Sequence, residues 1–125
     1  MRLLLDTHLV LWAMQDARAL SAAARRYLRE ADAVFVSAAS LWEIAIKSGL
    51  GKLEVNSVRL EQTLNEAGFQ QLPVHWSHAL KLRELPPLHR DPFDRMLVAQ
   101  ALTEPLRLLT HDAALVAYSD LVTLV

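Results

Sequence analysis

Short apolar runs alternate with longer amphipathic segments along the whole chain. The apolar runs are typical of strands, and they occupy residues 2–5, 33–36, 69–72, 106–109 and 121–124. The segments between them have the spacing of helices, at residues 8–14, 21–30, 38–48, 57–67, 75–83, 91–102 and 111–117. Strands that alternate with helices predict an α/β fold with a parallel sheet covered on both faces.

Capping residues support these boundaries. Ser21 and Ser37 stand where helix N-caps are expected, and Gly49 and Gly68 are expected to end helices. The chain has no internal repeat and no linker-like stretch. We therefore expect one domain over residues 1–125, long enough to bury a real core.

Five acidic residues fall at the carboxyl ends of predicted strands or at the starts of the helices that follow them. They are Asp6, Glu43, Asp91, Asp94 and Asp112. In right-handed βαβ units these positions share one edge of the sheet, the edge at which open α/β sheets bind ligands. Two carboxylates about 4 Å apart repel by roughly 4 kcal/mol at an effective dielectric constant near 20. The cluster therefore predicts a bound divalent cation.

Each acid also has a structural alternative. Asp6, Asp91 and Asp112 can cap helices, a role worth about 1 kcal/mol each. Asp94, at the third position of its helix, favours the helix dipole. Glu43 can form an ion pair with Lys47, four residues further along the same helix. The functional interpretation depends on all of these positions meeting at one edge, and not on any single residue.

Composition narrows the class of protein. Hydrophobic residues make up 53% of the chain and charged residues 22%, yet no apolar stretch reaches the roughly 18 residues of a membrane span. The acid at Asp6 comes too early for a signal peptide. The chain has no cysteine, which excludes disulfides, thiolate metal sites and a cysteine nucleophile. We expect a cytoplasmic protein with no membrane partner.

The formal net charge of −1 argues at first against a nucleic-acid partner. If four of the acids form a metal site, however, 10 acids remain against 13 lysines and arginines, a balance of about +3. The four acids set aside are Asp6, Glu43, Asp94 and Asp112. The remaining surface therefore permits contact with phosphates.

Four segments, taken in order, resemble the signatures of PIN-domain ribonucleases and, more narrowly, of the VapC-type toxins of type II toxin–antitoxin pairs. They are LLDTH at 4–8, SLWEIAIK at 40–47, HRDPFDRMLVAQA at 89–101 and LTHD at 109–112. The resemblance implies a PIN-like three-layer α/β/α fold with a central parallel sheet of four to five strands. It also implies an antitoxin partner, catalytic metal-binding roles for Asp6, Glu43, Asp94 and Asp112, and an accessory role for Asp91.

Carboxylate oxygens are hard ligands that suit Mg²⁺ or Mn²⁺. We expect Asp6, Asp94 and Asp112 to coordinate the ion, and Glu43 to complete the site through a bound water or to orient the attacking water. A metal-activated water would then hydrolyse RNA phosphodiester bonds. The main prediction is a metal-dependent endoribonuclease that acts as a toxin.

Neighbouring polar residues have two possible roles. Thr7 and Thr110 could hydrogen-bond the carboxylates or the scissile phosphate, or could be local caps. Lys47 and Arg95 could contact the RNA backbone, or could pair with the acids four residues before them. Trp12 and Trp42 are expected in the core or an interface, and the apolar richness of the small domain favours a homodimer.

Other function classes remain open. The five histidines show no metal-site spacing, although RNA cleavage driven by histidine without metal is possible. An aspartyl-nucleophile phosphatase would use Asp6 but typically carries a second Asp where this chain has His8. A non-catalytic metal- or partner-binding module would leave RNA intact with or without EDTA. The glycines at 49 and 51 lack the pattern of a phosphate-binding loop.

Overall fold

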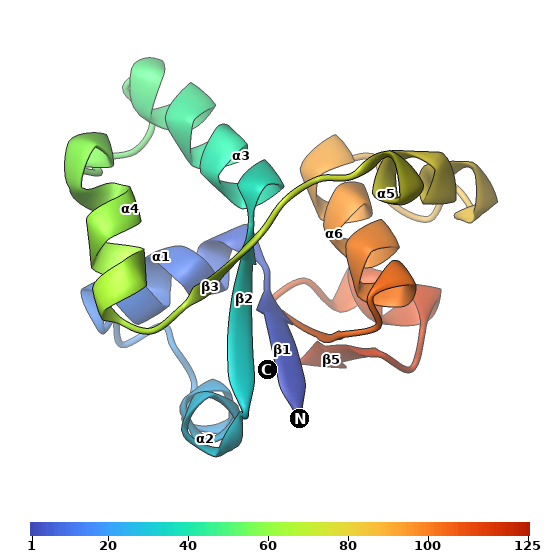
Figure 1. Cartoon of the computed structure of the whole chain (residues 1–125), viewed down its shortest axis with the longest axis horizontal. Helices are drawn as coiled ribbons and strands as arrows, with labels where there is room; N and C mark the ends of the chain where they lie inside the picture. Colours follow the sequence, from blue (N-terminus) through green and yellow to red (C-terminus); the bar gives the residue numbers. More distant parts are fainter.

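A computed structural model describes residues 1–125 apart from the side chain of Ser57, and its five strands form one sheet in the order β3-β2-β1-β4-β5 (Figure 1). The strands are β1 (Arg2–Leu5), β2 (Ala33–Ser37), β3 (Gln70–Leu72), β4 (Arg107–Thr110) and β5 (Val122–Leu124). Every neighbouring pair is parallel. The predicted parallel sheet is confirmed.

Helices connect the strands in the expected alternation. The α-helices are α1 (Thr7–Gln15), α2 (Ala22–Glu30), α3 (Ala38–Gly49), α4 (Ser57–Glu66), α5 (Trp76–Lys81) and α6 (Pro92–Thr103). Two 3₁₀ helices, η1 (Leu82–Glu84) and η2 (Ala113–Tyr118), complete the set of helices in the described residues. Within those residues, none of the helices combines the length and the apolarity needed to cross a bilayer.

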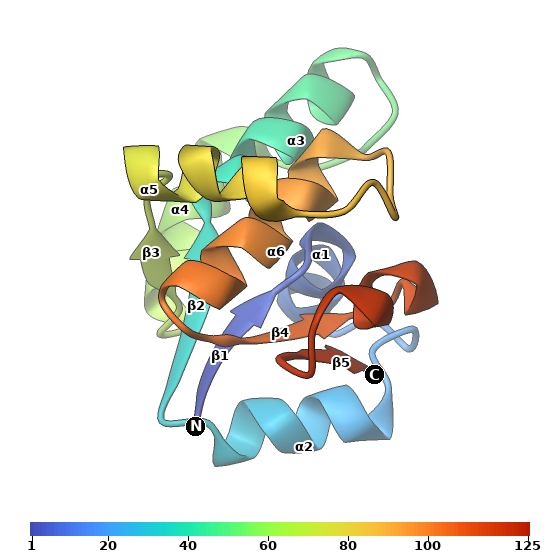
Figure 2. The same cartoon turned by 90° about the vertical axis from the view of Figure 1, so that its right-hand side faces the viewer.

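Alternate side chains of the central strands build one core on each face of the sheet. Leu3 and Leu5 of β1 pack with α1, α2 and α4, whereas Leu4 packs with α6 on the other face. Leu108 and Leu109 of β4 divide between the two cores in the same way. Figures 1 and 2 show α1 and α4 on one side of the sheet and α5 and α6 on the other. This gives the predicted three layers.

Three helical segments differ from the sequence-based expectation in helix type or in where they end. The segment expected as one helix at 75–83 is α5 followed by the 3₁₀ turn η1, and the short helix expected at 111–117 is the 3₁₀ helix η2. α3 includes Gly49, and the positive backbone φ of 73° belongs to Gly51 instead. The turn after α3 is therefore one that favours glycine at residue 51.

The strand register determines which residues meet at the carboxyl edge. Leu5 pairs with Leu109, so the next residues along, Asp6 and Thr110, lie side by side. The backbone N–H of Asp6 continues the ladder by donating to the carbonyl of Leu109 (3.0 Å). α3 begins directly after β2 at the same edge, where it contacts both α1 and α6.

Candidate metal centre

Asp6 is buried at the end of β1, with 3% of its surface exposed. Its Oδ1 accepts from the backbone N–H of Leu9 (2.9 Å), so it caps α1 as the structural alternative required. Its Oδ2 accepts from the hydroxyl of Thr110 and from the backbone N–H of His111, both at 2.8 Å. These three donors fix the carboxylate in one orientation.

Thr110 links Asp6 to Asp112. While its hydroxyl donates to Asp6, the same oxygen accepts from the backbone N–H of Asp112 (3.0 Å). Asp112 in turn caps η2, because its Oδ1 accepts from the N–H of Ala114 (2.9 Å). This hydrogen bond, and a second from His89, hold the pKa of Asp112 below its usual value. Of its two suggested roles, Thr110 therefore takes that of orienting carboxylates.

Asp91 and Asp94 both stand at the start of α6. Asp91 is the N-cap, its Oδ1 accepting from the N–H groups of Phe93 (2.8 Å) and Asp94 (3.0 Å), and Pro92 follows at the first helical position. The side chain of Asp94 has no hydrogen-bond donor among the described residues. Burial, and then the charges of Asp91, Asp6 and Glu43, raise the pKa of Asp94 to about 7.

Glu43 projects from the second turn of α3 and is 5% exposed. Its Oε2 accepts from Nζ of Lys47 (2.8 Å), so the expected ion pair is present. Its Oε1 is buried and has no partner among the described residues. The bond to Glu43, together with the charges of Glu43, Asp91 and Asp94, raises the pKa of Lys47 even though partial burial opposes the shift.

Three of the five carboxylates converge on one cleft of about 290 Å³. It is lined by Asp6, His8, Asp94, His111, Asp112 and Ala113. Glu43 and Asp91 do not line the cleft but lie close enough to shift the pKa of Asp94. An apolar cavity of about 160 Å³ also lies among β3, α4 and the start of α3, and it contains none of the five acids.

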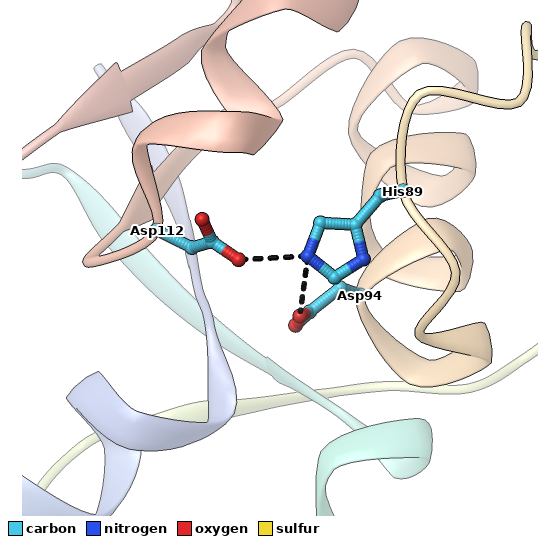
Figure 3. Close-up of side chains that lie close together, drawn as sticks. All are labelled: His89, Asp94 and Asp112. Atoms are coloured by element: carbon cyan, nitrogen blue, oxygen red, sulfur yellow. Dashed lines mark hydrogen bonds and ion pairs between the residues drawn. The ribbon is translucent and has the colours of Figure 1, made fainter.

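His89 is the residue that sequence reasoning missed. Figure 3 shows one ring nitrogen, Nε2, facing both carboxylates. Nε2 lies 2.7 Å from Oδ2 of Asp112 and 3.8 Å from Oδ2 of Asp94. Ligand atoms of His89, Asp94 and Asp112 all lie within 4.8 Å of one another. No spacing signal in the sequence marks His89, because the carboxylate that it hydrogen-bonds, Asp112, is 23 positions away.

Three other residues behave differently from one of their expected roles. Thr7 contacts the hydroxyl of Ser40 (3.1 Å), with no carboxylate among its hydrogen-bond partners in the described chain. Arg95 is not paired with Asp91 in the described ion pairs; its guanidinium contacts backbone carbonyls and the hydroxyl of Tyr118. Trp42 is 64% exposed, which excludes the core but not the interface that was expected as its other place, whereas Trp12 does pack against the core.

Comparison with known proteins places this architecture in a family. The sequence model of the PIN domain family matches residues 3–121, so the chain belongs to this family. Members of this family are generally nucleases. A comparison with curated proteins finds no significant match.

Several solved structures share the fold. One chain in the VapBC2 complex from Rickettsia felis, bound to a promoter DNA fragment, aligns over 100% of this chain and 98% of its own, with a TM-score of 0.70 and 14% identity. A chain of a toxin–antitoxin complex from Klebsiella pneumoniae aligns over 96% and 94%, with a TM-score of 0.69 and 17% identity. A chain of FitAcB from Neisseria gonorrhoeae aligns over 98% and 95%, with a TM-score of 0.67 and 19% identity.

Proposed function

We propose that this protein is a metal-dependent endoribonuclease of the cytoplasm, and that it acts as the toxin of a type II toxin–antitoxin module. The observation that supports the nuclease most directly is the state of Asp94. It is a half-buried carboxylate with no hydrogen-bond donor among the described residues, and burial, followed by the charges of three neighbouring acids, raises its pKa. A divalent cation removes this repulsion.

The donor set fits Mg²⁺ or Mn²⁺. All of the proposed ligands are carboxylate oxygens, which these hard ions prefer. The buried Oε1 of Glu43 has no partner in the described residues, and a buried charged oxygen without a partner is costly. Either the ion or one of its waters can satisfy it. The cleft, at about 290 Å³, has room for an ion, several waters and a phosphate group.

A bound Mg²⁺ or Mn²⁺ supplies a water of lowered pKa and polarises the phosphate. Asp6, Asp94 and Asp112 would hold the ion. Thr110 fixes the positions of Asp6 and Asp112 relative to each other through its two hydrogen bonds. Glu43 completes the site through a water, or accepts a hydrogen bond from the attacking water and so orients it. Asp91 acts as an accessory acid by setting the start of α6 and adding negative charge beside Asp94.

Basic side chains near the cleft suit a phosphodiester chain. Lys47 lies close to Glu43, Asp91 and Asp94, and its raised pKa keeps it protonated at neutral pH. We assign Lys47 to contact with the RNA backbone. A bound cation would neutralise Glu43 in place of Lys47 and so free the lysine for this contact. Nη1 of Arg95 already donates to the carbonyl of Pro86 and to the Tyr118 hydroxyl. Arg95 can therefore contact the RNA backbone only through its other guanidinium nitrogens.

The test is incubation of the purified protein with structured RNA, and with DNA of the same sequence, in Mg²⁺, Mn²⁺ or EDTA. We expect RNA cleavage only with metal, and at least a hundredfold loss of rate in Asp6→Asn and Asp94→Asn. The exposed Asp120 provides the control, since Asp120→Asn should cut at the wild-type rate. RNA left whole in every condition would identify a non-catalytic binding module, and cleavage in EDTA would identify a metal-free mechanism.

The geometry of Asp6 disfavours the phosphatase alternative. Three hydrogen bonds already bind its two carboxylate oxygens, and Oδ2 accepts two of them. Donors that stabilise the negative charge make the carboxylate a weaker nucleophile while leaving a lone pair of Oδ1 for a metal ion. Failure to trap a phosphorylated enzyme would agree with this assignment.

The toxin role is supported by the solved structures of similar fold. Three of them are described as a VapBC complex, a FitAB complex bound to DNA and a toxin–antitoxin complex. We infer a cognate antitoxin for this chain, and a basic side chain of that partner can enter the acidic cleft and displace the cation. Growth arrest on expression, lost in Asp94→Asn and relieved by the product of a neighbouring gene, would support the assignment.

The proposal includes a homodimer, supported by an apolar stripe along α3 and its C-cap residue, Leu50. Trp42, Ile46 and Leu50 follow one another at four-residue spacing and are 64%, 40% and 64% exposed. Side chains at this spacing share one helix face, and association with a second copy buries it. Sedimentation should therefore show a dimer that Trp42→Ser dissociates, whereas a wild-type monomer at all concentrations would exclude this interface.

A further inference from the structure

The hydrogen bonds of His89 indicate the tautomer of its neutral ring. Nδ1 accepts from the backbone N–H of Asp91 (3.0 Å), so in the neutral ring the proton is on Nε2. Nε2–H then donates to Oδ2 of Asp112 at 2.7 Å. With its lone pair bound to hydrogen, Nε2 cannot coordinate a cation, although its position beside two acids suggests a ligand (Figure 3).

A second contact fixes the segment that carries His89. Its backbone N–H donates to the hydroxyl of Tyr118 (3.0 Å), which also accepts from Nη1 of Arg95 (3.3 Å). Tyr118 ends η2, the helix that Asp112 begins, and Arg95 belongs to α6, the helix that carries Asp94. The His89–Tyr118–Arg95 contacts therefore join the two segments that supply the facing carboxylates.

We propose that His89 is a positioning residue for the cation site: it acts through Asp112, holding that carboxylate opposite Asp94 at the separation that a shared ion requires. The proposal rests on the metal site of the proposed function. Like charges drive the two carboxylates apart, and the Nε2–H bond with the Tyr118 contact opposes that separation. Donors to metal-binding side chains typically change metal affinity about 10–100-fold when removed.

The experiment is isothermal titration of Mn²⁺ into the whole chain, in wild type, His89→Phe and His89→Gln. Phenylalanine keeps a planar ring and removes the donor, so its dissociation constant should rise about 10–100-fold. Glutamine restores an N–H of similar reach and should return affinity to within about fivefold of wild type. Equal losses in the two variants, or a Phe variant that binds within threefold of wild type or more tightly, would overturn the proposal.

Two further variants separate the possible failures. Tyr118→Phe removes only the hydroxyl that accepts from His89, and it should weaken Mn²⁺ binding without unfolding the protein; unchanged affinity overturns the Tyr118 part of the argument. His75→Phe, at an exposed histidine outside the cleft, is the control and should bind as wild type does. If wild type takes up no Mn²⁺ the proposed function fails as well, whereas loss of the His89 effect alone leaves the metal site standing.

Discussion

Replacing Asp94 by Asn should stabilise the metal-free protein, and increasingly so as the pH rises. The pKa of Asp94 is about 7 in the folded chain, against 3.8 for the unfolded group. The folded protein therefore binds more protons than the unfolded one between these values, so the free energy of unfolding falls as pH rises from about 4 to about 7. Asparagine mimics the protonated acid and carries no such dependence.

The size of the effect follows from the shift. About three pKa units at roughly 1.4 kcal/mol each give an upper limit near 4 kcal/mol. The Asp94 side chain is 21% exposed, and solvent screening reduces this to about 2 kcal/mol. For a domain of this size that is a melting temperature about 8 °C higher in the variant above pH 8. Near pH 4 the two proteins should melt together.

Thermal unfolding in EDTA across pH 4–9 measures the difference between Asp94→Asn and wild type, with Asp120→Asn as a surface control. Adding Mg²⁺ should reverse the order at pH 8, because the ion stabilises only the chain that retains the carboxylate. A difference that does not change with pH, or an Asp94→Asn variant less stable than wild type at pH 8, would refute the electrostatic description of this cleft.

Two more substitutions test the surroundings of the site. Thr110→Val removes the donor to Asp6 and the acceptor for Asp112 at nearly constant volume. The free energy of unfolding in urea should fall by about 1–3 kcal/mol, and the rate of RNA cleavage should fall at least tenfold. Unchanged values for both would contradict the orienting role of Thr110. Lys47→Met leaves the buried Glu43 without the ammonium group that pairs with it. The pKa of Lys47 is raised, chiefly by its hydrogen bond to Glu43, so the lost partner is a charged one at neutral pH. The melting temperature of the metal-free variant should drop, and Mg²⁺ should raise it by more than it does in wild type. An equal Mg²⁺ effect in both proteins would show that Lys47 and the cation do not both neutralise Glu43.

Most of the fold was predictable because its signals are local. Apolar runs flanked by capping residues fixed the strands and helices, and the parallel sheet then brought distant acids to one edge. The contacts of His89 could not be predicted, since they depend on the separation between the start of α6 and η2. For Trp42 the sequence left core and interface open; the four-residue spacing to Ile46 and Leu50 favours a separate, exposed face.

Three of the five acids have a second task that does not depend on any reaction. Asp6, Asp91 and Asp112 each accept backbone N–H groups at the first turn of a helix. A descendant of this protein that lost its nuclease activity would still be selected to keep them for folding. Intact aspartates at those places are therefore poor evidence of an active relative, and the informative positions for judging one are Glu43 and Asp94, which cap nothing.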